Sequence, residues 1–341
     1  MEMPYLSILY LLIAAAISTL GTKAYISFAL NKNILAIPKD RSLHSVPIPK
    51  GGGIIIGATF LSGLLLLLLI NIVPSELAVA LLGGGIALVI VGFIDDLREV
   101  EPVIRFIIQF LVSFWALYWL GGMPEIEIGP WVLKQSWVLH LIGSLGIVWF
   151  INLFNFMDGV DGMLASNASL FSLMGALALF WLGHSSLSVI LVLLVASLTG
   201  FLIYNWAPAK VFMGDSGAAF IGYTLAVIAL YSVSERMLNF WTWIILMGYF
   251  VADTTTTMVI KIVTVRGWFH EEHRSHAYQQ LALMWKDHRR TTFFVLGITA
   301  FWMVPLALLS LRFQKNTVII AMIALAPVVT LTLLRGPFFR P

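Results

Sequence analysis

The sequence predicts an all-α membrane protein that crosses the bilayer about eleven times. Apolar residues make up 60% of the 341-residue chain and charged residues 11%, whereas soluble domains usually hold about 25% charged residues. The apolar residues gather in runs of about 20, the length that a helix needs to cross a bilayer. The Lys and Arg residues between these runs fall mostly in alternate loops, which is typical of polytopic proteins.

Composition also excludes several functional classes. A chain this apolar is not a soluble enzyme, and the absence of cysteine excludes disulfides, thiolate metal sites and cysteine nucleophiles. The net charge of +3 is too small to indicate a nucleic-acid partner, so the lipid bilayer is the expected environment.

Eleven apolar runs are expected to span the bilayer. They lie near residues 6–29, 52–73, 77–94, 103–121, 138–156, 165–183, 187–204, 216–233, 240–262, 291–311 and 316–334. The first run is interpreted as a retained span, because no Lys or Arg precedes it and no clear small-residue cleavage site follows. The run 77–94 is short and rich in Gly, and the last two runs have one re-entrant hairpin as their alternative. A total of ten spans is the alternative to eleven. No soluble domain is apparent, so residues 1–341 are interpreted as one integral-membrane domain.

Charge predicts the orientation. Fifteen Lys and Arg residues fall in one set of alternating loops, and the opposite loops hold four, Lys134, Arg236, Arg312 and Lys315. Because positive loops stay in the cytoplasm, the N-terminus is expected outside and the C-terminus in the cytoplasm.

Five aspartates fall at the ends of spans on the predicted cytoplasmic face. They are Asp95, Asp96, Asp158, Asp161 and Asp215. Neighbouring carboxylates repel one another, and a divalent cation with oxygen ligands, such as Mg²⁺ or Mn²⁺, relieves that repulsion. The plain alternative is five solvated loop acids.

Two segments strengthen the functional interpretation. In residues 152–162, polar residues recur at every third position, which places Asn152, Asn155 and Asp158 on one stripe if the segment is helical. In residues 205–217, Asp215 stands between two glycines at a predicted helix start, where free N–H groups favour phosphate. Asp215 as the N-cap of that helix is the alternative.

Two further groups of residues are open to more than one interpretation. The histidines His270, His273 and His276 suit a zinc site, a phosphate or substrate contact, or a solvated basic loop, and the adjacent Arg274 disfavours zinc. Asp253 lies inside an apolar run, followed by four threonines. It is either a functional acid or a structural hydrogen-bond node.

These motifs resemble the polyprenyl-phosphate N-acetylhexosamine-1-phosphate transferases of glycosyltransferase family 4. The resemblance runs from Pro38 to Gln279. It rests on GFIDD at 92–96 with PVIR at 102–105, on NLFNFMDGVDG at 152–162, and on VFMGDSG at 211–217. It implies a Mg²⁺-dependent enzyme of the bacterial inner membrane with its active site facing the cytoplasm. The enzyme transfers sugar 1-phosphate from a UDP-N-acetylhexosamine to undecaprenyl phosphate and releases UMP.

The resemblance also implies roles for individual residues. Asp215 is the expected main metal ligand, with Asp95 and Asn155 nearby, and Asp95 matches the group proposed to assist attack by the lipid phosphate. The active-site carboxylates are Asp95, Asp96, Asp158 and Asp161. The substrate-binding positions are Lys50, Arg105, Asn155, Asn205, Phe212, Arg274 and His276, among which Phe212 matches an aromatic that stacks on uracil.

The loop HRSHAYQ at 273–279 departs from the consecutive-histidine pattern of the MurNAc-pentapeptide and GlcNAc enzymes. It is similar to the subgroup that initiates O-antigen or capsule synthesis, whose donors include UDP-linked N-acetylfucosamine and N-acetylquinovosamine. A UDP-GlcNAc-specific initiating enzyme is the alternative, and relatives can form homodimers. A secondary transporter also carries intramembrane acids, but transporters hold them near the midplane and have internal repeats, which are not detected here.

Overall fold

Helices account for most of the described residues. The computed structural model describes residues 3–38, 46–134, 136–264 and 276–336. The helices are α1 (Met3–Asn31), α2 (Gly53–Leu69), α3 (Ser75–Leu97), α4 (Pro102–Trp119), α5 (Trp137–Phe156), α6 (Met163–Trp181), α7 (Ser185–Asn205), α8 (Asp215–Ser234), α9 (Phe240–Leu246), α10 (Gly248–Thr264), α11 (Ala277–Trp285), α12 (His288–Ile298), α13 (Val304–Arg312) and α14 (Thr317–Arg335). A π-helical turn, η2 (Thr299–Met303), joins α12 to α13, and a 3-10 turn, η3 (Gln314–Asn316), precedes α14.

The predicted fold class is confirmed. Within the described residues, nine helices are long and apolar enough to cross a membrane, and the bent pair α9–α10 makes a tenth. The apolar helix α2, with 17 residues, completes a helical counterpart for each of the eleven predicted runs. The last two runs form separate long helices of 25 and 22 residues, His288–Arg312 and Gln314–Arg335, and not the alternative short hairpin.

One predicted span is not a single straight helix. The run 240–262 is divided into α9 and α10, which meet at an angle of 84°. The break falls at Gly248, where an added Cβ atom would lie 2.9 Å from Met303 Sδ and 3.0 Å from Leu325 Cδ2. The close packing of α13, η2 and α14 against this point therefore accompanies a bend that hydropathy alone does not reveal.

Helix α8 lies at the centre of the bundle, with 89% of its apolar window buried. It packs against α3, α5 and α2, and glycines permit the close approach. A Cβ atom at Gly92 of α3 would clash with the backbone of Ser216, and one at Gly53 of α2 would clash with Gly217. Small residues at such crossings are the usual means by which membrane helices pack tightly.

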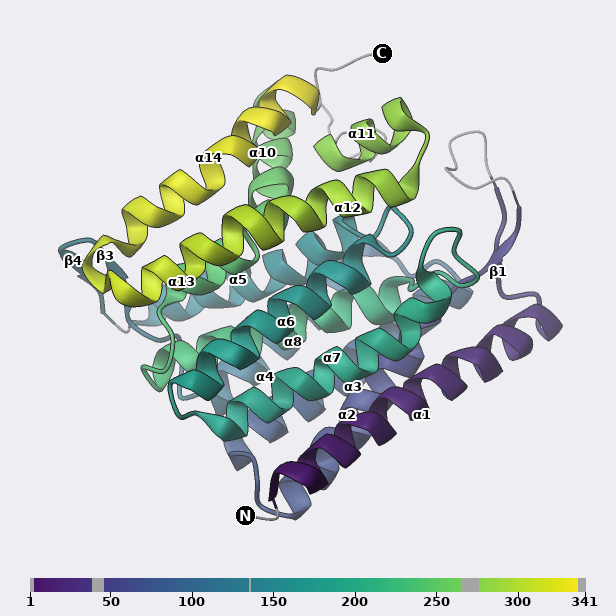
Figure 1. The fold of residues 1–341 in the computed structure, drawn as a ribbon, viewed down its shortest axis with the longest axis horizontal. Helices are drawn as coiled ribbons and strands as arrows, with labels where there is room; N and C mark the ends of the chain where they lie inside the picture. Colours follow the sequence, from purple (N-terminus) through teal and green to yellow (C-terminus); the bar gives the residue numbers. More distant parts are fainter. Residues whose placement is uncertain (1–2, 39–45, 135, 265–275, 337–341) are drawn as a thin grey trace.

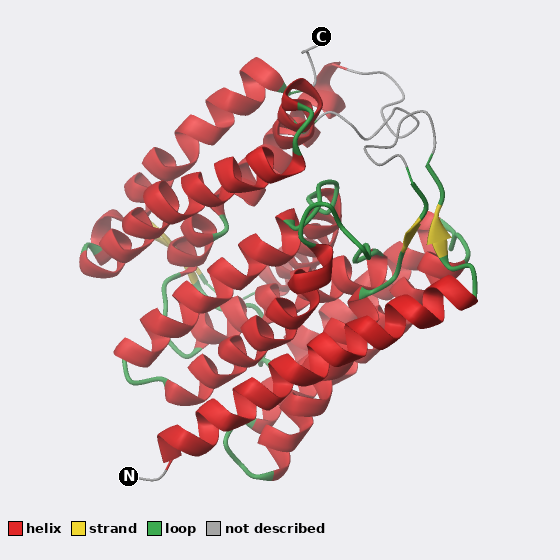
Figure 2. Ribbon diagram, turned by 45° about the vertical axis from the view of Figure 1, so that its right-hand side comes forward, coloured by secondary structure: helices red, strands yellow, loops and turns green. Residues whose placement is uncertain are grey.

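The helices run roughly side by side, and the connections between them gather at two ends (Figure 1). One end carries the hairpin of β1 (Leu35–Ala36) and β2 (Ile48–Pro49), and the other carries the hairpin of β3 (Ile126–Ile128) and β4 (Trp131–Leu133) (Figure 2). Both pairs are antiparallel, with Leu35 opposite Pro49 in the first. The loops α3–α4, α5–α6 and α7–α8 lie at the β1–β2 end, which brings the predicted site residues together.

Candidate active site

A large cavity opens at the β1–β2 end of the bundle, with a volume of about 1220 Å³. The predicted site residues in its wall are Lys50, Asp96, Arg105, Asn155, Asp158, Asp161, Asn205, Phe212, Asp215 and His276. Asp95 stands behind the wall in contact with Arg105. Arg274, His270 and His273 lie outside the described residues. The zinc-site interpretation of the three histidines therefore stays a prediction.

A single arginine joins two of the predicted carboxylates. Nη1 of Arg105 lies 2.8 Å from Asp95 Oδ2 and 2.9 Å from Asp215 Oδ2. The other oxygen of Asp95 accepts the backbone N–H of Val100 at 2.6 Å, just beyond the end of α3. One guanidinium thus holds α3, α4 and α8 together at the cavity, and it offsets only one of the two negative charges.

Asp96 caps the N-terminus of α8, although it belongs to α3. Its two carboxylate oxygens accept the backbone N–H groups of Asp215 at 3.1 Å and Ser216 at 3.2 Å, and Asp96 is only 6% exposed. The N-cap position itself is Gly214, which offers no side chain. A Cβ atom at Gly214 would clash with the Asp96 carboxylate, and φ there is +74°, a region that favours glycine. The N-cap alternative for Asp215 is therefore wrong, because Asp96 supplies the cap from another helix.

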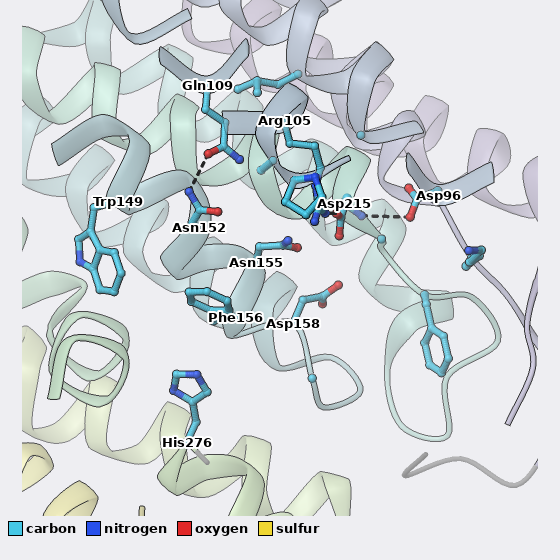
Figure 3. Close-up of a pocket in the computed structure, with 18 of the residues that line it drawn as sticks. Asp96, Arg105, Gln109, Trp149, Asn152, Asn155, Phe156, Asp158, Asp215 and His276 are labelled. Atoms are coloured by element: carbon cyan, nitrogen blue, oxygen red, sulfur yellow. Dashed lines mark hydrogen bonds and ion pairs between the residues drawn. The ribbon is translucent and has the colours of Figure 1, made fainter. Parts of the chain in front are cut away.

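Asp158 lies where negative charge is concentrated. In Figure 3, Asn155 and Asp158 lie below Asp215 on the same side of the cavity. Burial raises the pKa of Asp158 well above its usual range, and the charges of Asp215 and Asp96 raise it further, against a hydrogen bond from the Gly214 backbone. Asp158 is only partly exposed and lies near other carboxylates, unlike a fully solvated loop acid.

Asp161 faces two other segments. Its Oδ2 accepts the backbone N–H of Ala209 at 3.0 Å, and its Oδ1 lies 3.1 Å from Nδ1 of His288. Its backbone carbonyl accepts a hydrogen bond from Thr292 Oγ1 at 3.1 Å. Asp161 therefore connects the α5–α6 loop to the α7–α8 loop and to α12.

Asn205 has a similar connecting position at the end of α7. Its Oδ1 accepts the N–H of Gly162 at 3.1 Å, and its Nδ2 donates to the carbonyl of Val211 at 2.9 Å. The next residue of this loop, Phe212, donates its backbone N–H to the carbonyl of Pro49 at 2.8 Å. These bonds fix the loop that presents Phe212 to the cavity, and they engage both polar groups of the Asn205 amide.

Asp253 is a structural hydrogen-bond node. It is fully buried, and its oxygens accept the backbone N–H groups of Ala277 at 3.0 Å and Tyr278 at 3.3 Å, which begin α11. Thr257 and Thr332 donate their hydroxyls to it at 3.4 and 3.2 Å. Asp253 on α10 thus caps α11 in the way that Asp96 on α3 caps α8.

This cap supports His276, which lines the cavity, and Tyr278, which is fully buried two positions further along the chain. His276 stands immediately before α11 and stacks on Phe156, with ring centroids 5.8 Å apart (Figure 3). The hydroxyl of Tyr278 donates to the carbonyl of Phe156 at 2.7 Å and accepts the N–H of Gly159 at 3.1 Å. The position of α11 therefore affects the loop that carries Asp158.

Several residues of the wall were not identified from the sequence. Gln109 on α4 accepts a hydrogen bond from Asn152 on α5 at 2.7 Å, within an otherwise apolar part of the wall (Figure 3). An amide inside an apolar run is unfavourable unless it has a hydrogen-bond partner. The position of Gln109 in such a run could therefore have marked it as a candidate site residue. Lys261 and His288 also line the cavity, but in the sequence they are ordinary members of a basic segment.

The residues in the cavity wall have the chemistry to bind a divalent cation. Among the described residues, however, no three Asp, Glu or His side chains lie close enough together to form a metal-binding site. Burial, followed by the charges of Asp215 and Asp96, raises the pKa of Asp158, and the Arg105 guanidinium is paired with Asp95 and Asp215. The available donors are carboxylate and amide oxygens, the ligands that Mg²⁺ and Mn²⁺ prefer.

Comparisons with known proteins agree with this geometry. The family model described as glycosyl transferase family 4 matches residues 78–233, a range that includes all five predicted carboxylates. The chain is 28% identical over 258 residues to a probable undecaprenyl-phosphate N-acetylglucosaminyl 1-phosphate transferase of Bacillus subtilis, a match covering 74% of this chain and 70% of that protein.

Two further relatives are about equally similar. Identity is 31% over 235 residues with a decaprenyl-phosphate N-acetylglucosaminephosphotransferase of Mycobacterium tuberculosis, covering 63% of this chain and 57% of the relative. It is 30% over 229 residues with a phospho-N-acetylmuramoyl-pentapeptide-transferase of Geobacillus kaustophilus, covering 61% of this chain and 68% of the relative. The multi-span fold, the cavity motifs and these matches together show that the chain belongs to glycosyl transferase family 4.

Proposed function

We propose that the protein transfers N-acetylhexosamine 1-phosphate, or a deoxy derivative, from a UDP-sugar to undecaprenyl phosphate. The products are a sugar-diphospho-undecaprenol and UMP. The observation that carries this proposal is the composition of the cavity wall, which combines a charged end with an apolar side. The charged residues are Lys50, Asp96, Arg105, Asp158, Asp161, Asp215 and Lys261.

The apolar side suits the lipid acceptor. It is formed by α4 and α5 through Phe106, Leu145, Val148 and Trp149, and Trp149 lies away from Asp215 in Figure 3. A polyprenyl chain is favoured on such a surface, while its phosphate is drawn to the cations at the charged end.

The charged end suits phosphoryl transfer. An oxygen of the lipid phosphate attacks the phosphorus atom next to the sugar, a new P–O bond forms, and the P–O bond to UMP breaks. Both reactants are anionic, so the site must offset their repulsion and hold them in line. A bound Mg²⁺ supplies positive charge for this step, and Asp215, with Asp95 and Asn155, would hold it. Arg105 adds a cation beside the same carboxylates.

The donor is assigned to the α7–α8 loop. Phe212 offers an aromatic face for the uracil, and Asn205 holds the loop through both of its amide groups. The segment at 273–279 favours donors such as UDP-N-acetylfucosamine or UDP-N-acetylquinovosamine, and so the start of O-antigen or another surface polysaccharide. UDP-GlcNAc is the alternative donor, which the names of the Bacillus and Mycobacterium relatives favour. We place the protein in the bacterial inner membrane with the cavity facing the cytoplasm.

UMP release tests the proposal directly. Purified protein is given undecaprenyl phosphate, Mg²⁺ and a panel of UDP-N-acetylhexosamine donors, with EDTA as the metal control. Asp215→Asn is expected to abolish release. Glu235→Gln, at the C-cap of the same helix, is the matched control and is expected to leave release unchanged. Failure of every donor with folded protein would contradict the proposal and favour the transporter interpretation.

A further inference from the structure

His288 is a cavity residue that the sequence did not single out. It is the first residue of α12, and its side chain is 17% exposed in the wall of the cavity. It lies across from the α5–α6 loop, 127 positions away from Asp161 in the chain. The tertiary fold alone brings this imidazole into the proposed active site.

Asp161 holds one side of the imidazole. Nδ1 of His288 lies 3.1 Å from Asp161 Oδ1 and 3.3 Å from the Asp161 backbone nitrogen. One turn along α12, Thr292 donates its hydroxyl to the Asp161 carbonyl at 3.1 Å. These contacts hold the ring at Nδ1, no described residue forms a hydrogen bond with Nε2, and the side chain lines the cavity.

Asp161 itself is engaged by protein groups on both oxygens. Oδ2 accepts the N–H of Ala209 at 3.0 Å, while Oδ1 faces His288. The charge of Asp161 also acts on Asp158, as do those of Asp215 and Asp96, but the two oxygens of Asp161 have the α7–α8 loop and α12 as their partners. The two aspartates of the DGVDG segment consequently have different surroundings.

The same contacts place His288 on the donor side of the cavity. Ala209 belongs to the α7–α8 loop that presents Phe212, whereas the apolar surface assigned to the lipid is formed by α4 and α5. Because Nδ1 accepts the Asp161 N–H, Nε2 carries the ring proton and can donate a hydrogen bond to an anionic or hydroxyl oxygen.

We propose that His288 contacts an oxygen of the sugar diphosphate of the donor through Nε2, and that Asp161 is the positioning residue for this contact. The inference rests on the proposed function and adds a donor-binding residue to it.

His288→Asn is the discriminating variant. The Asn amide keeps an acceptor close to the position of Nδ1, so the bond from the Asp161 N–H is retained, but the group at Nε2 is removed. Because a hydrogen bond to a charged group contributes about 10- to 100-fold in affinity, the KM for the UDP-sugar is expected to rise by about that factor. The KM for undecaprenyl phosphate and the thermal unfolding midpoint should stay near the wild-type values.

Two controls complete the experiment. His184→Ala removes a histidine from the separate cavity that includes the α6–α7 loop and the β3 hairpin, and it is expected to change neither KM. Asp161→Asn should raise the donor KM in the same direction, and combining it with His288→Asn should add little, because the two residues act as one unit. Donor binding is also measured without turnover, as the rise in unfolding midpoint caused by the UDP-sugar.

The outcomes separate this inference from the proposed function. If the wild type releases UMP and His288→Asn keeps the wild-type donor KM and donor-induced stabilisation, the inference fails and the function stands. If His288→Asn lowers the unfolding midpoint without changing the donor KM, His288 is only a structural link and the inference is again overturned. If the wild type is inactive with all donors, both the proposed function and the inference about His288 are contradicted.

Discussion

Replacing Asp96 tests whether this buried carboxylate acts as a helix cap or in the chemistry. The structure has it accept two backbone N–H groups at the start of α8, the most enclosed helix of the bundle. Asp96→Ala removes both acceptors, and Asp96→Asn removes one while keeping an amide oxygen of similar size.

The expected loss in the free energy of unfolding follows from how deeply the two backbone N–H donors, those of Asp215 and Ser216, are buried. Ser216 is fully buried, so water does not readily replace its lost acceptor, and Asp215, whose side chain is 28% exposed, sets the lower end of the range. A buried donor left without a partner costs about 1–3 kcal/mol. Asp96→Ala is therefore expected to lower the free energy of unfolding by about 2–6 kcal/mol, and Asp96→Asn by about 1–3 kcal/mol.

The assay is denaturant or thermal unfolding of the purified protein in detergent, with UMP release measured on the same samples. Asp287→Ala is the matched control, because Asp287 caps its own helix α12 at an exposed position. Loss of such an exposed cap costs about 0.5–2 kcal/mol. The expected order of destabilisation is Asp96→Ala, then Asp96→Asn, then Asp287→Ala.

One result would refute the reasoning. If Asp96→Ala unfolds at the wild-type midpoint while UMP release is abolished, the cap is energetically unimportant and Asp96 acts in the reaction itself. Destabilisation without loss of activity under stabilising conditions would instead leave Asp96 with the structural role alone.

Three further predictions concern other parts of the cavity. Asp253→Ala should speed amide hydrogen exchange at the start of α11, including Tyr278, because it removes the acceptors of two backbone N–H groups, each worth about 1–3 kcal/mol. Unchanged exchange would contradict the role of Asp253 as a cap. Phe212→Ala should raise the KM for the UDP-sugar with little change in kcat, and an unchanged KM would exclude stacking on uracil. The folded-state pKa of Asp158 is raised, so its stabilising contribution is complete below about pH 4 and is lost as the pH rises through that raised pKa. In EDTA, Asp158→Asn should therefore be more stable than the wild type at neutral pH, with the difference vanishing near pH 4, and a pH-independent difference would oppose this assignment.

Hydropathy and charge along the chain were enough to predict the class of protein and the approximate positions of its spans. Hydropathy is a local property that sums over about 20 residues, so every predicted run has a helical counterpart, including the Gly-rich run that became α3. The carboxylates also gathered at one end as expected, since charged residues at span ends are placed by the same local rule.

The division of roles among these residues depends on contacts between distant parts of the fold. Asp96 and Asp253 each cap a helix other than their own, and His288 meets Asp161 from 127 positions away. The 84° bend at Gly248 likewise accompanies contacts with α13, η2 and α14. Such pairings depend on helix crossing and loop packing, which no local pattern of residues encodes, because the energy of a hydrogen bond between two elements exists only once both are in place.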